Sequence, residues 1–119
     1  MSHPVVWFEV MGKDGEKLQG FYKDLLGWKI DASNPMRYGM VEATEGRGIP
    51  GGVGELGDQP WPTTTTFYVS TTDINASLEE AGKLGGKTIM PRTELAGGTI
   101  LGFFADPEGN TMGLVEEAA

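Results

Sequence analysis

The chain has 119 residues and a net charge of −8, so it is long enough to bury a hydrophobic core and is strongly acidic. Nucleic acids and anionic membranes bind proteins through basic surfaces, so the charge argues against both as partners. The absence of cysteine excludes disulfides, thiol nucleophiles and cysteine-based metal sites. The N-terminal residues lack a cationic segment followed by an apolar one, and no stretch is long enough to span a membrane, so we expect a cytoplasmic protein.

The first half of the chain predicts the order strand, helix, strand, strand, strand. Alternation of apolar and polar residues predicts a first strand with one buried face. An apolar stripe at helical spacing then predicts a helix packed into the core, and Gly27 is placed to end it. The expected strands are 5–11, 28–32, 37–43 and 51–56, with the helix at 16–26. The stripe consists of Leu18, Phe21, Tyr22, Leu25 and Leu26.

The second half predicts the same order of elements. A short connector at 57–62, stiffened by two prolines, leads into it without separating two domains. Thr72 is expected to cap the second helix, with Asp73 in its first turn, and Gly86 to end it. The helix stripe is Ile74, Leu78, Ala81 and Leu84, and it is also expected in the core. The expected strands are 63–70, 87–94, 99–105 and 111–116, with the helix at 73–84.

The two halves also match each other in sequence. Residues 7–30 and 66–89 are identical at six of 24 positions under one offset of 59 residues, where about one or two matches are expected by chance. We interpret this as a tandem duplication of one βαβββ unit. The predicted fold is therefore α+β, in one domain with module one at 1–56 and module two at 63–119. The identical pairs are Phe8/Phe67, Val10/Val69, Asp14/Asp73, Leu25/Leu84, Gly27/Gly86 and Ile30/Ile89.

Three segments resemble the vicinal oxygen chelate superfamily, which includes glyoxalase I, bleomycin-resistance proteins and extradiol dioxygenases. They are FYKDLLGW at 21–28, VSTTDINASL at 69–78 and FADPEGNTMGL at 104–114; the DPEGN turn is the most specific. The resemblance covers essentially the whole chain. It implies curved sheets with the helices on their convex side. It also implies a concave ligand cleft between paired modules, commonly in a homodimer.

In metal-dependent members of that superfamily, the first and last strands of each module supply the metal ligands, usually His, Gln or Glu. The matching positions here are Trp7 and Thr66 on the first strands, and Gly113 on the last strand of module two. The offset of 59 residues places the fourth position at Gly54. None of the four residues offers the imidazole or carboxylate that a divalent ion requires. We therefore predict no metal and no cofactor, although His3, Glu9 and Glu55 lie near enough to suggest a substitute site.

The side chains expected along the cleft are a mixture of aromatic and polar groups. Trp7 is interpreted either as a flat surface on which a planar molecule stacks or as packing at a module interface. Glu9 is interpreted either as a buried acid with a raised pKa that exchanges protons with a ligand, or as a carboxylate fixed by hydrogen bonds. Tyr68 occupies the position of Glu9 in the repeat, and Trp61 is interpreted as a boundary anchor.

These observations predict a metal-independent protein that binds a small hydrophobic or aromatic molecule. The predicted ligand-binding residues are Trp7, Glu9, Gly54, Thr66, Tyr68 and Gly113. Glu9 is the only candidate for catalysis, so whether the protein is an enzyme is left open. Two alternatives stay open as well: a metal-dependent lyase or dioxygenase, and a non-catalytic interaction module. The fold itself does not decide among them.

Overall fold

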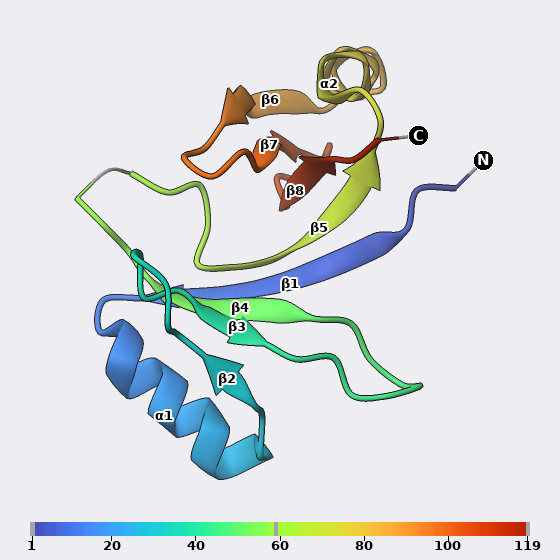
Figure 1. Ribbon diagram of the computed structural model, residues 1–119. Coiled ribbons are helices and arrows are strands. Elements are labelled where there is room, and N and C mark those ends of the chain that lie inside the picture. The colour runs from blue at the N-terminus through green and yellow to red at the C-terminus, as the bar shows by residue number, and fades with distance from the viewer. Residues whose placement is uncertain (1, 59, 119) are drawn as a thin grey trace. The chain divides into compact units, whose positions relative to one another are not determined.

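The computed structural model describes residues 2–58 and 60–118. These residues contain eight strands and two helices, which confirms the predicted α+β class (Figure 1). They divide into two compact units. The unit Trp7–Thr65 is called the first half below. The second half consists of the described residues of Thr66–Ala119 together with those of Met1–Val6, although the sequence predicts residues 1–6 in module one.

The first half contains strand β1 (Val5–Gly12) from Trp7 onward, helix α1 (Gly15–Leu26) and strands β2 (Ile30–Asp31), β3 (Gly39–Val41) and β4 (Gly51–Glu55). Strand β1 pairs in parallel with β4, and the order β1-β4-β3-β2 continues through antiparallel pairs. Helix α1 lies along one face of these strands (Figure 1). Its N-cap is Asp14, whose carboxylate accepts a hydrogen bond from the Lys17 amide. Gly27 ends the helix in the left-handed conformation, as predicted.

The second half contains strand β5 (Thr65–Thr71), helix α2 (Ile74–Lys83) and strands β6 (Lys87–Glu94), β7 (Ile100–Ala105) and β8 (Thr111–Glu116). Strand β5 pairs in parallel with β8, and β7 and β6 follow in antiparallel pairs. The core under α2 consists of Ile74, Leu78 and Leu114, with Phe104 packed against it. The predicted DPEGN turn is present, and the Asp106 carboxylate accepts hydrogen bonds from two backbone amides and from the Asn110 side chain.

Two details of the α2 ends differ from the prediction. The N-cap is Asp73, whose carboxylate accepts from the Ala76 amide, and Thr72 precedes it. The left-handed residue after the helix is Gly85, with φ of 100°, so α2 ends one residue earlier than the repeat predicted. Gly86 is needed for another reason: a Cβ there would lie 2.5 Å from the Ala105 carbonyl oxygen.

The prediction that both helix stripes belong to the core is wrong in part. Phe21, Leu25 and Leu26 of α1 are 56%, 64% and 50% exposed, and Leu84 after α2 is 71% exposed. Helix α1 instead turns Gln19 toward the strands, where its amide donates to the Val53 carbonyl oxygen at 2.7 Å. Because Gln19 lies beside the expected stripe, the buried face of α1 is rotated away from Phe21 and Leu25.

Candidate functional site

The side chain of Glu9, on β1, is the centre of a hydrogen-bonded cluster of aromatic residues. Glu9 is only 6% exposed. One carboxylate oxygen accepts from the Tyr38 hydroxyl at 2.9 Å, and the other accepts from the Trp61 indole N–H at 3.1 Å. The Tyr38 hydroxyl in turn accepts from the Trp7 indole N–H at 3.0 Å. We call Trp7, Glu9, Tyr38 and Trp61 the Glu9 cluster.

The backbone places these side chains on the strand face that points away from α1. Trp7 and Glu9 are two residues apart on β1 and so share one face. Phe8, between them, points to the other face, where its ring contacts Trp28 at a centroid distance of 5.1 Å. Tyr38 precedes β3, and its backbone N–H and carbonyl are both held by the Asn34 side chain. Three segments far apart in sequence therefore meet at one carboxylate.

Glycines on β4 make room for the Tyr38 ring. A Cβ at Gly52 would lie 1.8 Å from the Tyr38 hydroxyl oxygen, and a Cβ at Gly54 would lie 2.8 Å from the ring. Residues 52 and 54 share a strand face because side chains alternate along a strand. Only glycine at these positions lets the tyrosine lie flat enough on the strand to reach Glu9.

The electrostatics of the cluster keep the Tyr38 hydroxyl protonated. Burial raises the pKa of Tyr38 far above its ordinary value, and the negative charge of Glu9 raises it further. The bond from Trp7 acts in the opposite direction but is weaker. Tyr38 is therefore a permanent hydrogen-bond donor to Glu9 rather than a base.

The other predicted site residues lie together in the second half. Tyr68 pairs with Gly113 across β5 and β8, and its ring covers Gly113, where a Cβ would lie 2.4 Å from it. The ring also packs edge-on against Phe103 at 5.5 Å, and Tyr68 and Phe103 are 3% and 0% exposed. Thr66 is buried and donates from its hydroxyl to the Thr111 carbonyl oxygen at 3.1 Å. This set is thus a packed aromatic core in which the threonine hydroxyl bonds to backbone carbonyl oxygens.

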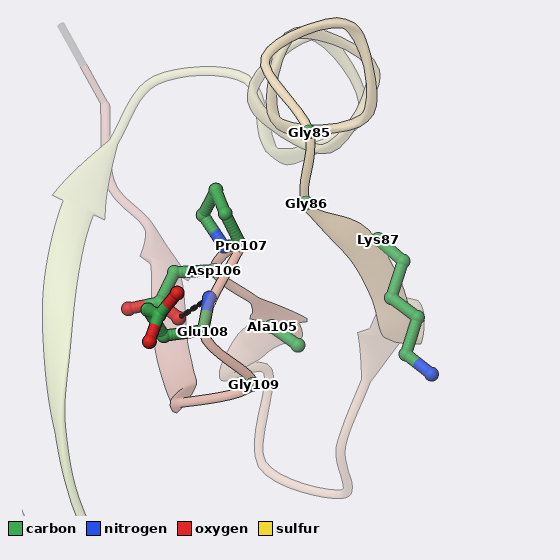
Figure 2. A pocket seen from close by; sticks show the side chains of 8 residues that line it. All are labelled: Gly85, Gly86, Lys87, Ala105, Asp106, Pro107, Glu108 and Gly109. Atoms are coloured by element: carbon green, nitrogen blue, oxygen red, sulfur yellow. Dashed lines mark hydrogen bonds between the residues drawn. The ribbon is translucent and has the colours of Figure 1, made fainter.

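Two hollows lie on the helix side of the second half. The larger has a volume of about 580 Å³ and runs along α2. The smaller, of about 380 Å³, lies where the residues before β6 meet the DPEGN turn. Figure 2 shows the smaller hollow, with the Asp106 carboxylate bonded to the Glu108 amide and the Lys87 side chain extending away from the turn.

The sequence model of the glyoxalase-like domain family matches residues 7–115 of this chain. The chain belongs to this family. The glyoxalase-like domain therefore spans both halves, from Trp7 on β1 to Val115 on β8, and membership of the vicinal oxygen chelate superfamily is confirmed.

Individual relatives agree with this assignment. The domain is 30% identical over 110 residues to a "Glyoxylase-like domain-containing protein" of Didymella fabae, covering 87% of this chain and 85% of that protein. It is 25% identical to "Putative glyoxylase CFP32" of Mycobacterium tuberculosis, and spans 91% of this chain but only 43% of the mycobacterial protein. A member of the glyoxalase/bleomycin resistance protein/dioxygenase superfamily from Vibrio splendidus shares the fold, with a TM-score of 0.62 at 14% identity, covering 98% and 100% of the two chains.

The positions that hold metal in metal-dependent members do not fit a metal in this glyoxalase-like domain. The strand pairing shows that the counterpart of Gly113 is Gly52 rather than the predicted Gly54, because Gly113 pairs with Tyr68 as Gly52 pairs with Glu9. At both glycines a tyrosine ring occupies the space that a ligating side chain would enter. Within residues 2–58 and 60–118, no three His, Asp or Glu side chains gather in a way that could hold a metal ion.

Sequence reasoning missed Tyr38 and underestimated Trp61. Tyr38 has no counterpart in the repeat, because the offset of 59 residues pairs it with Gly97. The available signal was the run Gly51-Gly52-Val53-Gly54 in a predicted strand, since glycines on one strand face indicate that a large side chain lies on them.

Neither helix in the described part of the domain has both the length and the apolar character needed to cross a membrane.

Proposed function

We propose that this glyoxalase-like domain binds a small aromatic or hydrophobic molecule at the Glu9 cluster, without a metal ion. The observation that carries the proposal is the buried Glu9 carboxylate held by one phenol and one indole, with a second indole bonded to that phenol. Trp7, Tyr38 and Trp61 are each only half-buried, so part of each ring remains available.

The cluster has the physical properties of a preorganised binding surface. Tryptophan and tyrosine offer large flat areas for stacking. Here the polar edge of each ring is already bonded within the cluster, so little rotational freedom is lost when a ligand arrives. A mostly aromatic surface with a few fixed polar groups is typical of small-molecule sites.

The geometry supports binding more strongly than proton transfer. Both Glu9 oxygens already accept hydrogen bonds, which fixes the carboxylate in place. Tyr38 does not give up its proton near neutral pH, because its pKa is raised. We therefore assign Glu9 the role of orienting the rings, and through them the ligand.

The test starts with protein purified without added metal. Native mass spectrometry gives bound small molecules and the oligomeric state, for which we propose a homodimer, and elemental analysis of the same sample gives the metal content. Saturation-transfer NMR with naphthol, quinoline and coumarin then tests binding of planar molecules. We expect binding of at least one of them and no stoichiometric metal. One tightly bound divalent ion per chain would contradict the proposal.

Variants of two tryptophans locate the binding. Trp7→Phe replaces the indole with a smaller phenyl ring and removes its hydrogen bond to Tyr38, and should weaken binding of the planar probe several-fold. Trp28→Phe is the matched control, because Trp28 lies on the helix side of β1, stacked on Tyr22 at a centroid distance of 5.2 Å. Equal affinity of Trp7→Phe and the wild type would place the ligand elsewhere.

A further inference from the structure

The larger hollow of the second half has the form of a second binding site. It is bounded by α2, by strands β5, β7 and β8, and by the turn that begins at Asp106. Its walls are mostly apolar, with Val69, Ala81, Phe104 and Leu114 among them. Its volume of about 580 Å³ lies within the range of small-molecule pockets. We call it the α2 groove.

The groove exists because the second copy of the repeat lacks the large side chains of the first. In the first half, Tyr22 of α1 stacks on Trp28, and Trp28 contacts Phe8. The offset of 59 residues pairs Tyr22 with Ala81 and Trp28 with Lys87. It likewise pairs Leu18 with Ser77 and Phe21 with Glu80, and Ser77, Glu80 and Ala81 all line the groove. Small and polar residues on this helix face leave open the space between α2 and β5.

The groove is not a copy of the Glu9 cluster. Phe104 and Leu114 pack in the core beneath α2, whereas Phe103, next to Phe104 on β7, points to the other face and packs on Tyr68. The groove is thus on the helix side of its strands. Trp7, Glu9, Tyr38 and Trp61 all belong to the other unit of the chain.

The carboxylates that line the groove outnumber its basic groups, although Arg92 outside the lining interacts electrostatically with Asp73. Asp73, Glu80 and Asp106 line it, and no lysine or arginine does. Asp106 is ionised at neutral pH, because its bonds to the Asn110 side chain and nearby amides hold its pKa below the ordinary value. His3 is the one basic residue of the lining, and its Nδ1 bonds to the Ser70 carbonyl oxygen at 2.9 Å. The net charge of −8 adds to the same field.

We propose that the α2 groove binds a small apolar amine in its protonated form. Its hydrocarbon part would lie against Phe104, Leu114 and Ala81, and its ammonium group would lie at the acidic rim. Apolar walls provide affinity by removing hydrocarbon surface from water, and the carboxylates select a cation over an anion of the same shape.

Two probes of one shape and opposite charge test this. They are 2-(1-naphthyl)ethylamine and 3-(1-naphthyl)propionate, titrated into isotopically labelled full-length protein by NMR. We expect the amine to shift the backbone signals of residues in and next to α2, and to bind about tenfold more tightly than the carboxylate. Equal affinity of both probes, or amine-induced shifts confined to the first half, would overturn the proposal.

Three variants separate the rim from the walls. Asp73→Asn with Glu80→Gln removes two charges while asparagine retains the helix cap, and should weaken amine binding about three- to tenfold. Glu79→Gln is the matched control, because Glu79 lies on the same helix, is exposed and does not line the groove. Ala81→Tyr restores the residue type of the first half and should abolish binding of the amine, with circular dichroism confirming that the variant is folded.

Two further results would also overturn the proposal. Trp7→Phe should leave the shifts in α2 unchanged, and loss of those shifts would mean that the amine binds at the Glu9 cluster. If Ala81→Tyr converts a dimer into a monomer in analytical ultracentrifugation, the groove holds a second copy of the chain rather than an amine.

Discussion

The two halves of this domain share their backbone plan and differ in what fills it. In the first half, aromatic rings pack between helix and strands, and the other strand face carries hydrogen bonds around Glu9. In the second half, aliphatic side chains and Phe104 form the core beneath α2, and the other face carries the buried Tyr68–Phe103 pair. The open space has therefore moved to the helix side. Two halves with one order of elements can therefore differ in which face of their strands is left open.

Both halves have the same hydrogen bonds at the N-termini of their helices. Asp14 and Asp73 cap α1 and α2 in the same way. A glutamate at the end of each last strand also accepts from the first helical amide: Glu55 from Gly15, and Glu116 from Ile74. The unpaired amides of a helix N-terminus need acceptors whatever the core contains, so this requirement persists while side chains elsewhere diverge.

The largest expected effect is the difference in stability loss between a substitution on the buried strand face of the second half and one on the exposed helix stripe of the first half. Phe103→Ala empties a fully buried position under Tyr68, and should lower the free energy of unfolding by about 3 to 5 kcal/mol. Leu25→Ala in α1 should change it by less than about 0.5 kcal/mol, because Leu25 is 64% exposed. Urea denaturation of both variants measures the difference. A large loss for Leu25→Ala would show that another surface covers α1 in solution.

The two glycines beneath tyrosine rings should differ in their tolerance of a Cβ. Gly113→Ala pushes against the Cδ1 and Cε1 atoms on one side of the Tyr68 ring, which packs on Phe103, and should cost about 3 kcal/mol. Gly52→Ala pushes against the hydroxyl end of Tyr38, which can move aside, so about 1 to 2 kcal/mol is expected. Gly20→Ala is the control, because no atom lies within 4 Å of a Cβ there. Equal costs at residues 52 and 113 would mean that Tyr38 is as rigid as Tyr68.

A smaller loss is expected from the hydroxyl of Tyr38 alone. Tyr38→Phe removes the donor to Glu9 and the acceptor for Trp7, and should cost about 1 to 2 kcal/mol in unfolding experiments. Binding of the planar probe should weaken as well, because the indole of Trp7 loses its anchor. Tyr22→Phe is the matched control, since Tyr22 contacts its neighbours through its ring. Unchanged probe binding in Tyr38→Phe would remove Tyr38 from the site.

The order of helices and strands was predictable from the sequence. The spacing of apolar residues distinguishes helix from strand, and turn residues mark where each element ends. Strands β6 and β8 match the predicted 87–94 and 111–116, and each end of the other elements lies within two residues of its predicted position. The register of β4 was not predictable. Three of the four residues Gly51–Gly54 have no side chain, so no alternation fixes which of them faces Glu9, and the constant offset selected Gly54 instead of Gly52.

The candidate site was predictable in part. Because side chains alternate between the two faces of a strand, the sequence predicts Trp7 and Glu9 on one face. The structure brings them into one hydrogen-bonded cluster. Tyr38 and Trp61 reach that cluster from segments outside the repeat, and their positions depend on tertiary contacts that one strand cannot reveal. The same limit applies to the rotation of α1, where Gln19 bonds to a strand carbonyl in place of the expected apolar contact.

The last comparison concerns the glutamates that support the helix N-termini. Of Glu55 and Glu116, only Glu116 forms an ion pair with a described residue, namely with Arg92 at 2.8 Å. The hydrogen bonds from Arg92 and the Ile74 amide lower the pKa of Glu116 to about 2. A carboxylate whose pKa is lower in the folded state stabilises the fold above its unfolded pKa. That contribution is lost as the pH falls from about 4.5 through about 2, where Glu116 becomes protonated.

Glu116→Gln should therefore be less stable than the wild type at pH 6, and the two melting temperatures should converge as the pH approaches about 2. Arg92→Gln should show the same convergence from a smaller deficit at pH 6, because the Ile74 amide still bonds to Glu116. Thermal unfolding at pH 6, 4 and 2.5 provides the comparison, with Lys83→Gln as the control because its ion pair with Glu79 is exposed. A deficit for Glu116→Gln that stays constant over this range would show that Glu116 acts by packing and not by charge.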